Sequence, residues 1–517
     1  MRAVRSVTLV LALALCGPQG ADAQERRLGE IAFPNSGSGA AQSDFIEGVL
    51  LLHSFEFADA AQAFRRAQAT DPDFALAFWG EAMTYNHPLW REQDRNAALA
   101  TLARFAPTPQ ARQEKAQTPR EAAYLAAVDV LYGEGDKTTR DRAYMHAMER
   151  LAAAHPDDVE AAAFHSLAIL GSTDGERDFS TYMKAAAVSL PIFDAHPQHP
   201  GAAHYIIHSF DDPVHAPLGL EAARAYSEIA PDAAHAQHMT SHIFVAMGLW
   251  DDLVAANVRA RDVQNTGRAR AGSGPNVCGH YTSWLHYGWL QRGEVQAAAQ
   301  GMQDCLDRVL AGGDPAEVNY FVNMRARHVI DLGDWEAAER LSASLSHPGY
   351  HFVNGYAAIR RGDVSAAQAA LIRLAEVATD AQPRRQIEHM ELAALLADHN
   401  GDAEGAIRLL EQAAALEETL PFEFGPPASL QPPHELLGAI YMQNERPADA
   451  ARAFRRALEF TPRRTTSLLG LAAASDVLGD QAAARAALLE LEGIWRNADP
   501  DFLQRLGIGS TGEGAAR

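Results

Sequence analysis

The sequence has little cysteine and a deficit of basic residues. Only three cysteines occur in 517 residues, and no Cys-x-x-Cys-His motif is present, which excludes covalent c-type haem. Lysine and arginine total 44 against 66 acidic residues, giving a formal net charge of -22. Because such an acidic surface repels phosphate backbones, we expect no nucleic acid partner. It favours cations or basic peptides, weakly and without specificity.

Several catalytic motifs are also missing. There is no glycine-rich nucleotide loop, no Gly-x-Ser-x-Gly elbow and no convincing cysteine–histidine nucleophile pair. The stretch HELLG at His434 lacks the second histidine of a zinc-protease helix. We therefore expect no nucleotide cofactor and find no support for a zinc protease. Whether the chain is an enzyme stays open on these grounds.

Long apolar runs are absent too, so we expect no stable membrane insertion. The longest run near the N-terminus, residues 7–16, is too short to span a bilayer. It follows Arg2 and Arg5 and precedes Ala21-Asp22-Ala23, the order of a secretory signal peptide. We predict a signal peptide over residues 1–23 and an exported protein, either periplasmic or secreted.

What the chain has in abundance is helical periodicity arranged in repeats. Residues 431–464, QPPHELLGAIYMQNERPADAARAFRRALEFTPRR, read as two helices closed by a proline. Residues 41–74 repeat the same spacing of small and large residues. The shared positions are Gly48, Ala60, Phe64, Ala67 and Pro72, matched by Gly438, Ala450, Phe454, Ala457 and Pro462. Small residues let two helices approach closely, and the large residue fills the gap between units.

This pattern resembles the tetratricopeptide repeat (TPR), a helix–turn–helix unit of 34 residues. The resemblance implies an all-α, TPR-type α-solenoid, a right-handed superhelix of helix–turn–helix repeats, over residues 41–506. Residues 24–40 are expected to form a flexible N-terminal segment and residues 507–517 a disordered tail. The Pro-rich insertion at residues 418–433 either packs into the groove or links two repeat blocks. Segments such as HPGAAHYIIHSFDDP and FEFGPP also resemble a group of exported bacterial repeat proteins to which no activity is assigned.

Histidine is concentrated in one stretch: eight of the 21 histidines fall between residues 196 and 242. His204 and His208 are spaced i,i+4, as are His238 and His242, and the two pairs are 34 residues apart. An i,i+4 pair lies on one face of a helix. Because the offset equals the repeat period, the pairs should occupy matching positions on neighbouring helices. The TPR resemblance implies that these positions line the concave groove.

These four histidines, with His235 on the same helix face, are the predicted metal ligands. Imidazole donors suit zinc, copper or iron, among other transition metals. Three alternatives remain at this stage. The histidines could be satisfied polar residues of a groove, a pH-sensitive patch, or residues buried between helices in a different register.

Other polar residues are candidates for supporting roles. One of Asp211 and Asp212 could be a ligand or could orient an imidazole, although the Asp-Asp-Pro sequence also favours a turn. The further candidates are His280, Glu81 and His87. Core packing is the simpler explanation for most of the aromatic residues around Glu81 and His87.

Cys278 and Cys305 form a predicted disulfide, because a helical hairpin turning near residues 291–293 would bring them together. The alternative is two buried small apolar residues.

Three functions fit these features. The first is an exported TPR solenoid whose groove binds a protein or peptide partner and carries a histidine-rich transition-metal site. The second is a metal-dependent enzyme, hydrolytic or oxidative, that uses the same histidines. The third is an envelope assembly scaffold without metal.

Overall fold

The computed structural model describes residues 26–174, 177–340, 347–379 and 381–507. The predicted signal peptide and residues 508–517 of the predicted tail lie outside these ranges. In the described ranges, regular structure other than helix is limited to a two-stranded hairpin of β1 (Asn86–His87) and β2 (Glu92–Gln93). No described helix is both long enough and apolar enough to cross a membrane.

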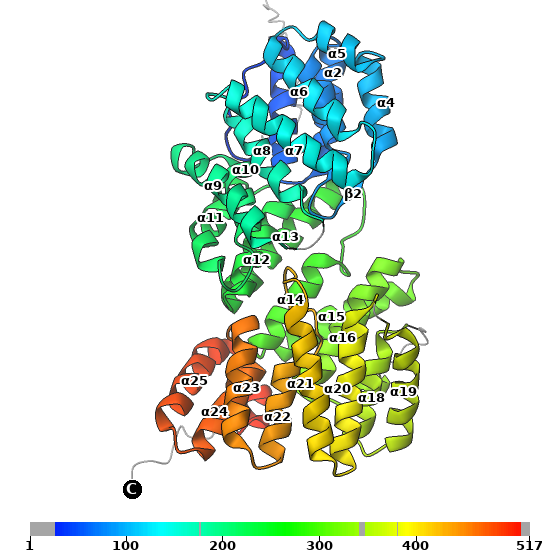
Figure 1. Cartoon of the computed structure of the whole chain (residues 1–517), viewed down its shortest axis with the longest axis vertical. Helices are drawn as coiled ribbons and strands as arrows, with labels where there is room; N and C mark the ends of the chain where they lie inside the picture. The colour runs from blue at the N-terminus through cyan, green and yellow to red at the C-terminus, as the bar shows by residue number, and fades with distance from the viewer. Residues whose placement is uncertain (1–25, 175–176, 341–346, 380, 508–517) are drawn as a thin grey trace, which may run out of the picture.

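The helices fall into two blocks in Figure 1, with α14 where the blocks meet. The upper block contains η1 (Gly39–Ala41), α1 (Gln42–His53), α2 (Phe57–Thr70), α3 (Ala75–Met83), α4 (Arg95–Phe105), α5 (Pro109–Lys115), α6 (Pro119–Leu131), α7 (Lys137–Ala154), α8 (Val159–Gly171), α9 (Phe179–Ala195), α10 (Pro200–Ser209), α11 (Ala216–Ile229), α12 (Ala234–Ala246) and α13 (Trp250–Arg270). The lower block contains α14 (His280–Gln291), α15 (Val295–Leu310), α16 (Pro315–Leu332), α17 (Ala337–Arg340), α18 (Tyr350–Arg360), α19 (Val364–Val377), α20 (Pro383–His399), α21 (Ala403–Thr419), α22 (Pro433–Gln443), α23 (Pro447–Phe460), α24 (Thr465–Val477), α25 (Gln481–Ile494), η2 (Trp495–Asn497) and α26 (Pro500–Arg505).

Most helices pack mainly against their neighbours in sequence, as expected of a helical-repeat protein. The two repeats predicted most clearly show the packing in detail. The ring of Phe64 lies against Gly48 and Gly80, and the ring of Phe454 lies against Gly438 and Gly470. A Cβ atom added at any of these four glycines would come within 2.8 Å of the ring. The predicted all-α, TPR-type solenoid is confirmed.

The C-terminal helices return to the middle of the chain. Arg464 is fully buried and pairs with Asp331 and Glu435, at 2.6 and 2.9 Å. The indole of Trp250 donates to the carbonyl oxygen of Arg463, and the indole of Trp495 donates to the carbonyl oxygen of Gln291. These long-range contacts hold α13 and α14 against the C-terminal repeats and so fix one side of the histidine site.

The N-terminal segment corrects one expectation. Residues 26–40 are not a flexible arm, because Leu28 and Phe33 are buried in the main core. The backbone N–H of Glu30 donates to the carbonyl oxygen of Gln198, and Ser36 bonds to the buried Glu121. Two buried apolar side chains and long-range hydrogen bonds supply the free energy that orders this non-helical stretch.

Cys278 and Cys305 form a disulfide with a Cα–Cα distance of 4.4 Å. Cys278 lies just before α14 and Cys305 lies in α15. The disulfide therefore links the two halves of the helical hairpin that α14 and α15 form. Because His280 follows Cys278 by two residues, the bridge also restrains the start of the helix that carries this histidine.

Candidate metal centre

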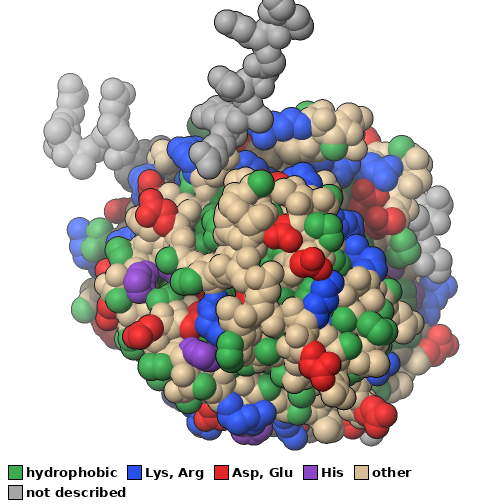
Figure 2. All heavy atoms as spheres, turned by 90° about the horizontal axis from the view of Figure 1, so that it is seen from above, with side chains coloured by type: hydrophobic (Ala, Val, Ile, Leu, Met, Phe, Trp, Pro, Cys, Tyr) green, Lys and Arg blue, Asp and Glu red, His purple; other side chains and the backbone are tan. Residues whose placement is uncertain are grey.

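The repeat register brings the predicted histidine pairs together. His204 and His208 lie on α10, and His238 and His242 lie on α12, the first helices of two successive helical hairpins. All four side chains are buried. Histidines are accordingly sparse on the face shown in Figure 2, where acidic and basic side chains are interspersed.

The clustered histidines form two sets of three. The His204 set contains His204, His208 and His235, and the His238 set contains His238, His242 and His280. Within each set, one nitrogen from every imidazole lies within 4.8 Å of the others. The sets adjoin: ring centroids are 6.1 Å apart for His208 and His242, and 6.2 Å apart for His235 and His238.

Hydrogen bonds to Nδ1 fix the tautomer of three of these imidazoles. His242 Nδ1 bonds to Asp211 Oδ2 at 2.6 Å, and His204 Nδ1 bonds to the carbonyl oxygen of His53 at 2.6 Å. His238 Nδ1 bonds to Asn257 Oδ1 at 2.7 Å, while the amide nitrogen of Asn257 donates to Leu253. All three partners accept, so each Nδ1 carries the proton and each Nε2 keeps its lone pair. This is the usual arrangement behind metal-binding histidines.

The Nε2 atoms of the His238 set lie close together. His242 Nε2 lies 3.2 Å from His238 Nε2, and His280 Nε2 lies 2.9 Å from His238 Nε2. Nitrogens around a tetrahedral ion at 2.0–2.1 Å would be roughly 3.3 Å apart. A proton on His280 Nε2 can bridge to His238, but the lone pairs of His238 and His242 still repel each other. A shared cation would reverse that repulsion.

The His204 set has buried nitrogens without a hydrogen-bond partner among the described residues. They are His204 Nε2, both ring nitrogens of His208, and His235 Nε2. A buried polar atom left unsatisfied costs about 1–3 kcal/mol. Four such atoms in one small volume are therefore a strong indication of a ligand.

Burial keeps these imidazoles neutral. Desolvation lowers the pKa of His204 to about 3, against the opposing hydrogen bond to the carbonyl of His53. Desolvation, reinforced by the neighbouring imidazoles, also drives the pKa of His208, His235 and His238 well below the usual value. Neutral imidazole is the form that binds a metal ion.

A third polar cluster, formed by Glu160, His53 and His199, lies next to the His204 set. The carboxylate of Glu160 lies 2.7 Å from His53 Nε2 and 3.2 Å from His199 Nε2. Burial opposes ionisation of Glu160, but His199 and His53 outweigh it and hold its pKa at about 2. His53 Nδ1 bonds to the hydroxyl of Tyr205 at 2.8 Å, and His199 Nδ1 accepts from the N-terminus of α10. The Glu160 cluster thus positions His53, whose carbonyl orients His204.

Aromatic side chains wall the site. Phe55 adopts a left-handed backbone conformation, φ 53°, and its ring centroid lies 4.3 Å from that of His204. Trp90 packs against His235 at 5.8 Å, and Trp284 packs against His242 at 4.6 Å. A left-handed non-glycine residue costs about 1–2 kcal/mol, a cost that the packing around Phe55 must offset.

A cavity of about 960 Å³ lies over the histidines. Imidazoles of both sets line it, together with Trp90, Tyr281, Trp284 and Phe424. His280 is the most exposed histidine of the six because it faces this space. A small molecule entering the cavity would meet both histidine sets.

The Pro-rich segment, residues 418–433, contributes to the wall of this site. Phe424 lies 6.1 Å from His242 and 6.2 Å from His208 between ring centroids. Gly425 next to it has φ 99°, and a Cβ there would lie 2.4 Å from the ring of Trp284. Only glycine therefore allows this segment to reach the histidines, which supports the first of the two sequence-based interpretations.

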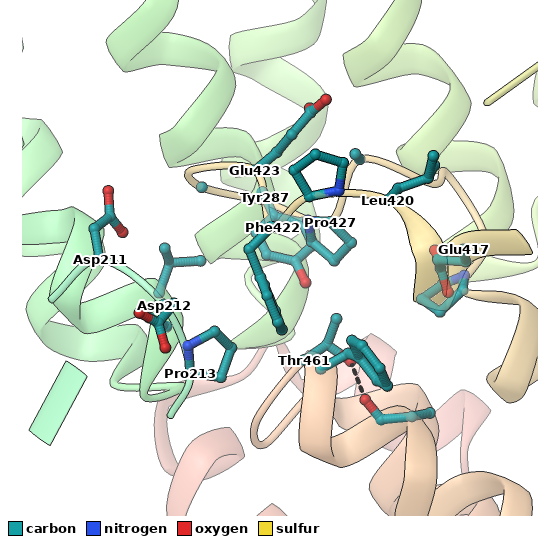
Figure 3. Close-up of a pocket in the computed structure, with 18 of the residues that line it drawn as sticks. Asp211, Asp212, Pro213, Tyr287, Glu417, Leu420, Phe422, Glu423, Pro427 and Thr461 are labelled. Carbon is teal, nitrogen blue, oxygen red and sulfur yellow. Dashed lines mark hydrogen bonds between the residues drawn. The ribbon is translucent and has the colours of Figure 1, made fainter. Parts of the chain in front are cut away.

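The same segment roofs a second cavity of about 100 Å³, shown in Figure 3. Phe422 and Pro427 lie in it opposite Asp211, Asp212 and Pro213 from the α10–α11 loop. The ring of Phe422 stacks on Phe460 at 5.7 Å. Asp211 therefore lies between this second cavity and the His238 set.

The residues predicted to have supporting roles differ in their positions relative to the histidines. His280 belongs to a donor set rather than to the surroundings. Asp211 orients His242, as one of the two interpretations held, whereas Asp212 pairs with Arg177 and accepts from Val214 and His215 in the turn.

Two of the candidates lie outside the donor sets. Glu81 is buried among Arg65, Gln68 and Arg104 and serves the core of the first repeats. His87 bonds to the carbonyl of Thr84 and stacks on Phe57. Neither shares a donor set with the clustered histidines, because local ion pairing and stacking hold both side chains elsewhere.

Sequence reasoning missed several residues of the site. Asn257, Glu160 and His199 act through contacts between different helices, and no spacing rule links them to the histidines. One sequence feature could have pointed to Phe55, namely its position just after the first helix of a repeat. Another feature could have pointed to Phe424, because the sequence FEFGPP interrupts the helices.

No protein-family model matches the chain, and no curated protein matches it. Among solved structures, the human IFIT1 dimer with m7Gppp-AAAA is 11% identical, with 91% of this chain and 92% of that chain covered and a TM-score of 0.33. The P58(IPK) TPR domain is 14% identical, with 86% and 99% covered and a TM-score of 0.23. TM-scores this low carry no inference about function. The helix pairs and their glycine–phenylalanine packing themselves make this chain a helical-repeat protein with a TPR-like fold.

Proposed function

We propose that this helical-repeat protein binds a transition metal through its clustered histidines. The observation that carries the proposal is the pair of Nε2 atoms of His238 and His242, 3.2 Å apart. Hydrogen bonds from Nδ1 to Asn257 and Asp211 force both lone pairs toward the same point. The four unpartnered nitrogens of the His204 set support the same conclusion.

The protein's role follows from the cavity beside the metal centre. The helical-repeat fold is consistent with protein binding, and we propose a protein or peptide segment as the occupant of this groove. The aromatic residues Trp90, Tyr281 and Phe424 offer contacts for its side chains. The second candidate is a metal-dependent enzyme. What favours it is that the cavity reaches histidines of both sets, so a bound ion could be open to a small substrate.

Elemental analysis of the purified protein tests the metal proposal. We expect at least one equivalent of a transition metal per chain, and a lower metal content in His238→Ala and His242→Ala than in the wild-type protein. His196→Ala is the matched control, because His196 belongs to the same histidine-rich stretch but is exposed. Circular dichroism checks that each variant folds, and His242→Asn keeps the size of the side chain. Less than a tenth of an equivalent in the wild-type protein would contradict the proposal.

Metal dependence separates the two roles. A partner bound in the groove should be lost in Trp90→Ala and Phe424→Ala even when the metal content is unchanged. An enzyme should instead lose turnover of a small substrate when a chelator removes the metal.

We also propose export, supported by the N-terminal pattern of residues 1–23 and by the Cys278–Cys305 disulfide, which oxidising compartments favour. N-terminal sequencing of the protein from cells should find Gln24 first. A chain that still begins at Met1 would contradict it.

A further inference from the structure

We propose that the centre holds two metal ions, one for each histidine set, and that the ions are copper in its monovalent state. This inference rests on the proposed metal binding and adds the number and the identity of the ions.

The number follows from the donors. A single ion with imidazole ligands is usually four-coordinate, so six histidines exceed what one ion can use. The histidines also divide into two groups by distance. Ring centroids are 4.8 and 5.2 Å apart within the His204 set and 5.0 and 4.5 Å apart within the His238 set. Between the sets they are 6.1 and 6.2 Å apart. Each set keeps three donors after its structural hydrogen bonds are made.

Both sets present imidazole nitrogens that could bind an ion. In the His238 set, the Nε2 atoms are already 2.9 and 3.2 Å apart. In the His204 set, Nε2 of His204 and of His235 and the nitrogens of His208 have no partner among the described residues. An ion bound only to the His238 set would leave those four buried atoms unexplained.

The third candidate cluster differs from both sets. The carboxylate of Glu160 faces His53 and His199, and the second nitrogen of each imidazole bonds to Tyr205 or to the N-terminus of α10. Three of its four imidazole nitrogens are hydrogen-bonded, and the fourth, His199 Nε2, lies 3.2 Å from Glu160 Oε1 without hydrogen-bond geometry. We assign this cluster a structural role.

The identity follows from charge. Neither set contains a carboxylate or thiolate among the described residues. Two acids lie beside the sets: Asp211 bonds to His242 Nδ1, and Glu56 accepts from the backbone N–H of His235. Two divalent ions would place four positive charges in a buried, aromatic-walled site with six neutral ligands. Two monovalent ions halve that charge, and Coulomb repulsion between two equal charges falls fourfold. Among the metals that imidazole binds well, copper has a stable monovalent state.

Anaerobic titration of the metal-free full chain with Cu⁺ tests the number of ions. We expect two equivalents for the wild-type protein and for His196→Ala. We expect one equivalent for the double variant His204→Ala/His208→Ala and one for His238→Ala/His242→Ala. Where a double variant does not fold, as judged by circular dichroism, the single variants His208→Gln and His242→Gln replace it.

The outcomes separate this inference from the proposed function. One equivalent in the wild-type protein would overturn the ion pair and leave metal binding intact, whereas no binding of Cu⁺, Zn²⁺ or any other transition metal would overturn both. Tight uptake of two Zn²⁺ without uptake of Cu⁺ would overturn the assignment to copper.

Electron paramagnetic resonance tests whether the ions are neighbours. After oxidation to Cu²⁺, the wild-type spectrum should be broadened or diminished by spin–spin coupling, and each double variant should give the spectrum of an isolated ion. Two isolated spectra in the wild-type protein would place the ions apart and would contradict the proposal.

Discussion

The repeats at residues 41–74 and 431–464 have the same skeleton but different surroundings. Phe64 and Phe454 pack against equivalent glycines, and the turn after the first helix of each repeat contains a left-handed residue, Phe55 in one and Glu445 in the other. Glu445 is exposed, whereas Phe55 is buried against the histidines. His53, which orients His204, has Gln443 as its counterpart. The two repeats thus share their backbone geometry. A few side chains at and just after the end of α1 make the N-terminal repeat part of the histidine site.

Truncating the two core phenylalanines should have the largest effect. Phe64→Ala and Phe454→Ala should each lower the free energy of unfolding by about 3–5 kcal/mol, the cost of removing a buried aromatic ring. Only Phe64→Ala should also weaken metal binding, because α1 ends at His53 and leads directly into the turn that holds Phe55. Denaturant titration and metal competition measure the two effects. Equal loss of metal affinity in both variants would show that the repeats are not functionally distinct.

Asp211→Asn should weaken metal binding by about 10–100-fold, the usual effect of losing the hydrogen-bonded acid behind a histidine ligand. Asp449→Asn, in the C-terminal repeat, is the control, because Asp449 forms ion pairs with Arg446 and Arg452, away from the histidines. Competition with a chromogenic chelator gives both affinities. An unchanged affinity in Asp211→Asn would mean that His242 is not a ligand.

Stability of the metal-free protein should fall as the pH falls. The pKa of His204 is about 3 in the folded protein and 6.5 in the unfolded chain, so unfolding takes up a proton between these values. Its contribution is fully present above pH 6.5 and is lost at about 1.4 kcal/mol per pH unit down toward pH 3. The lowered pKa values of His208, His235 and His238 act in the same direction.

Denaturant unfolding at pH 7, 6 and 5 measures this slope, and His204→Ala should reduce it. A slope that is the same with and without His204 would mean that this imidazole is not buried in its neutral form.

The smallest effect concerns the left-handed residues. Glu445→Gly should stabilise the protein by about 0.5–1 kcal/mol, because glycine accepts a positive φ without strain and this side chain is exposed. Phe55→Gly relieves the same strain but removes a buried ring, so it should destabilise the protein and weaken metal binding. Thermal melts compare the pair. Stabilisation by Phe55→Gly would mean that the ring contributes little to the site.

The sequence was sufficient to predict the fold and the clustering of the histidines. Repeat spacing identifies the packing of Phe64 and Phe454, and the 34-residue offset places the two histidine pairs on α10 and α12, where His208 lies beside His242. Both predictions depend on periodicity, which a single sequence displays directly. The flexible segment over residues 24–40 was predicted wrongly for residues 26–40, because the burial of Leu28 and Phe33 depends on helices far along the chain.

The surroundings of the site could not be predicted in this way. His280 lies outside the 34-residue register, since the long helix α13 and the loop after it separate it from α12. Asn257 and Glu160 reach the histidines from other helices, and Phe424 arrives from a segment more than 180 residues away in sequence. Such contacts follow from tertiary packing and leave no local pattern in the sequence.

The most direct test of the central claim is an anomalous diffraction measurement on crystals of the protein as purified. The account predicts an anomalous peak at a transition-metal edge at 2.0–2.1 Å from the Nε2 atoms of His238 and His242, with a second peak in the His204 set. Electron density for water alone among these imidazoles, with no anomalous signal after incubation with Cu⁺ or Zn²⁺, would contradict it.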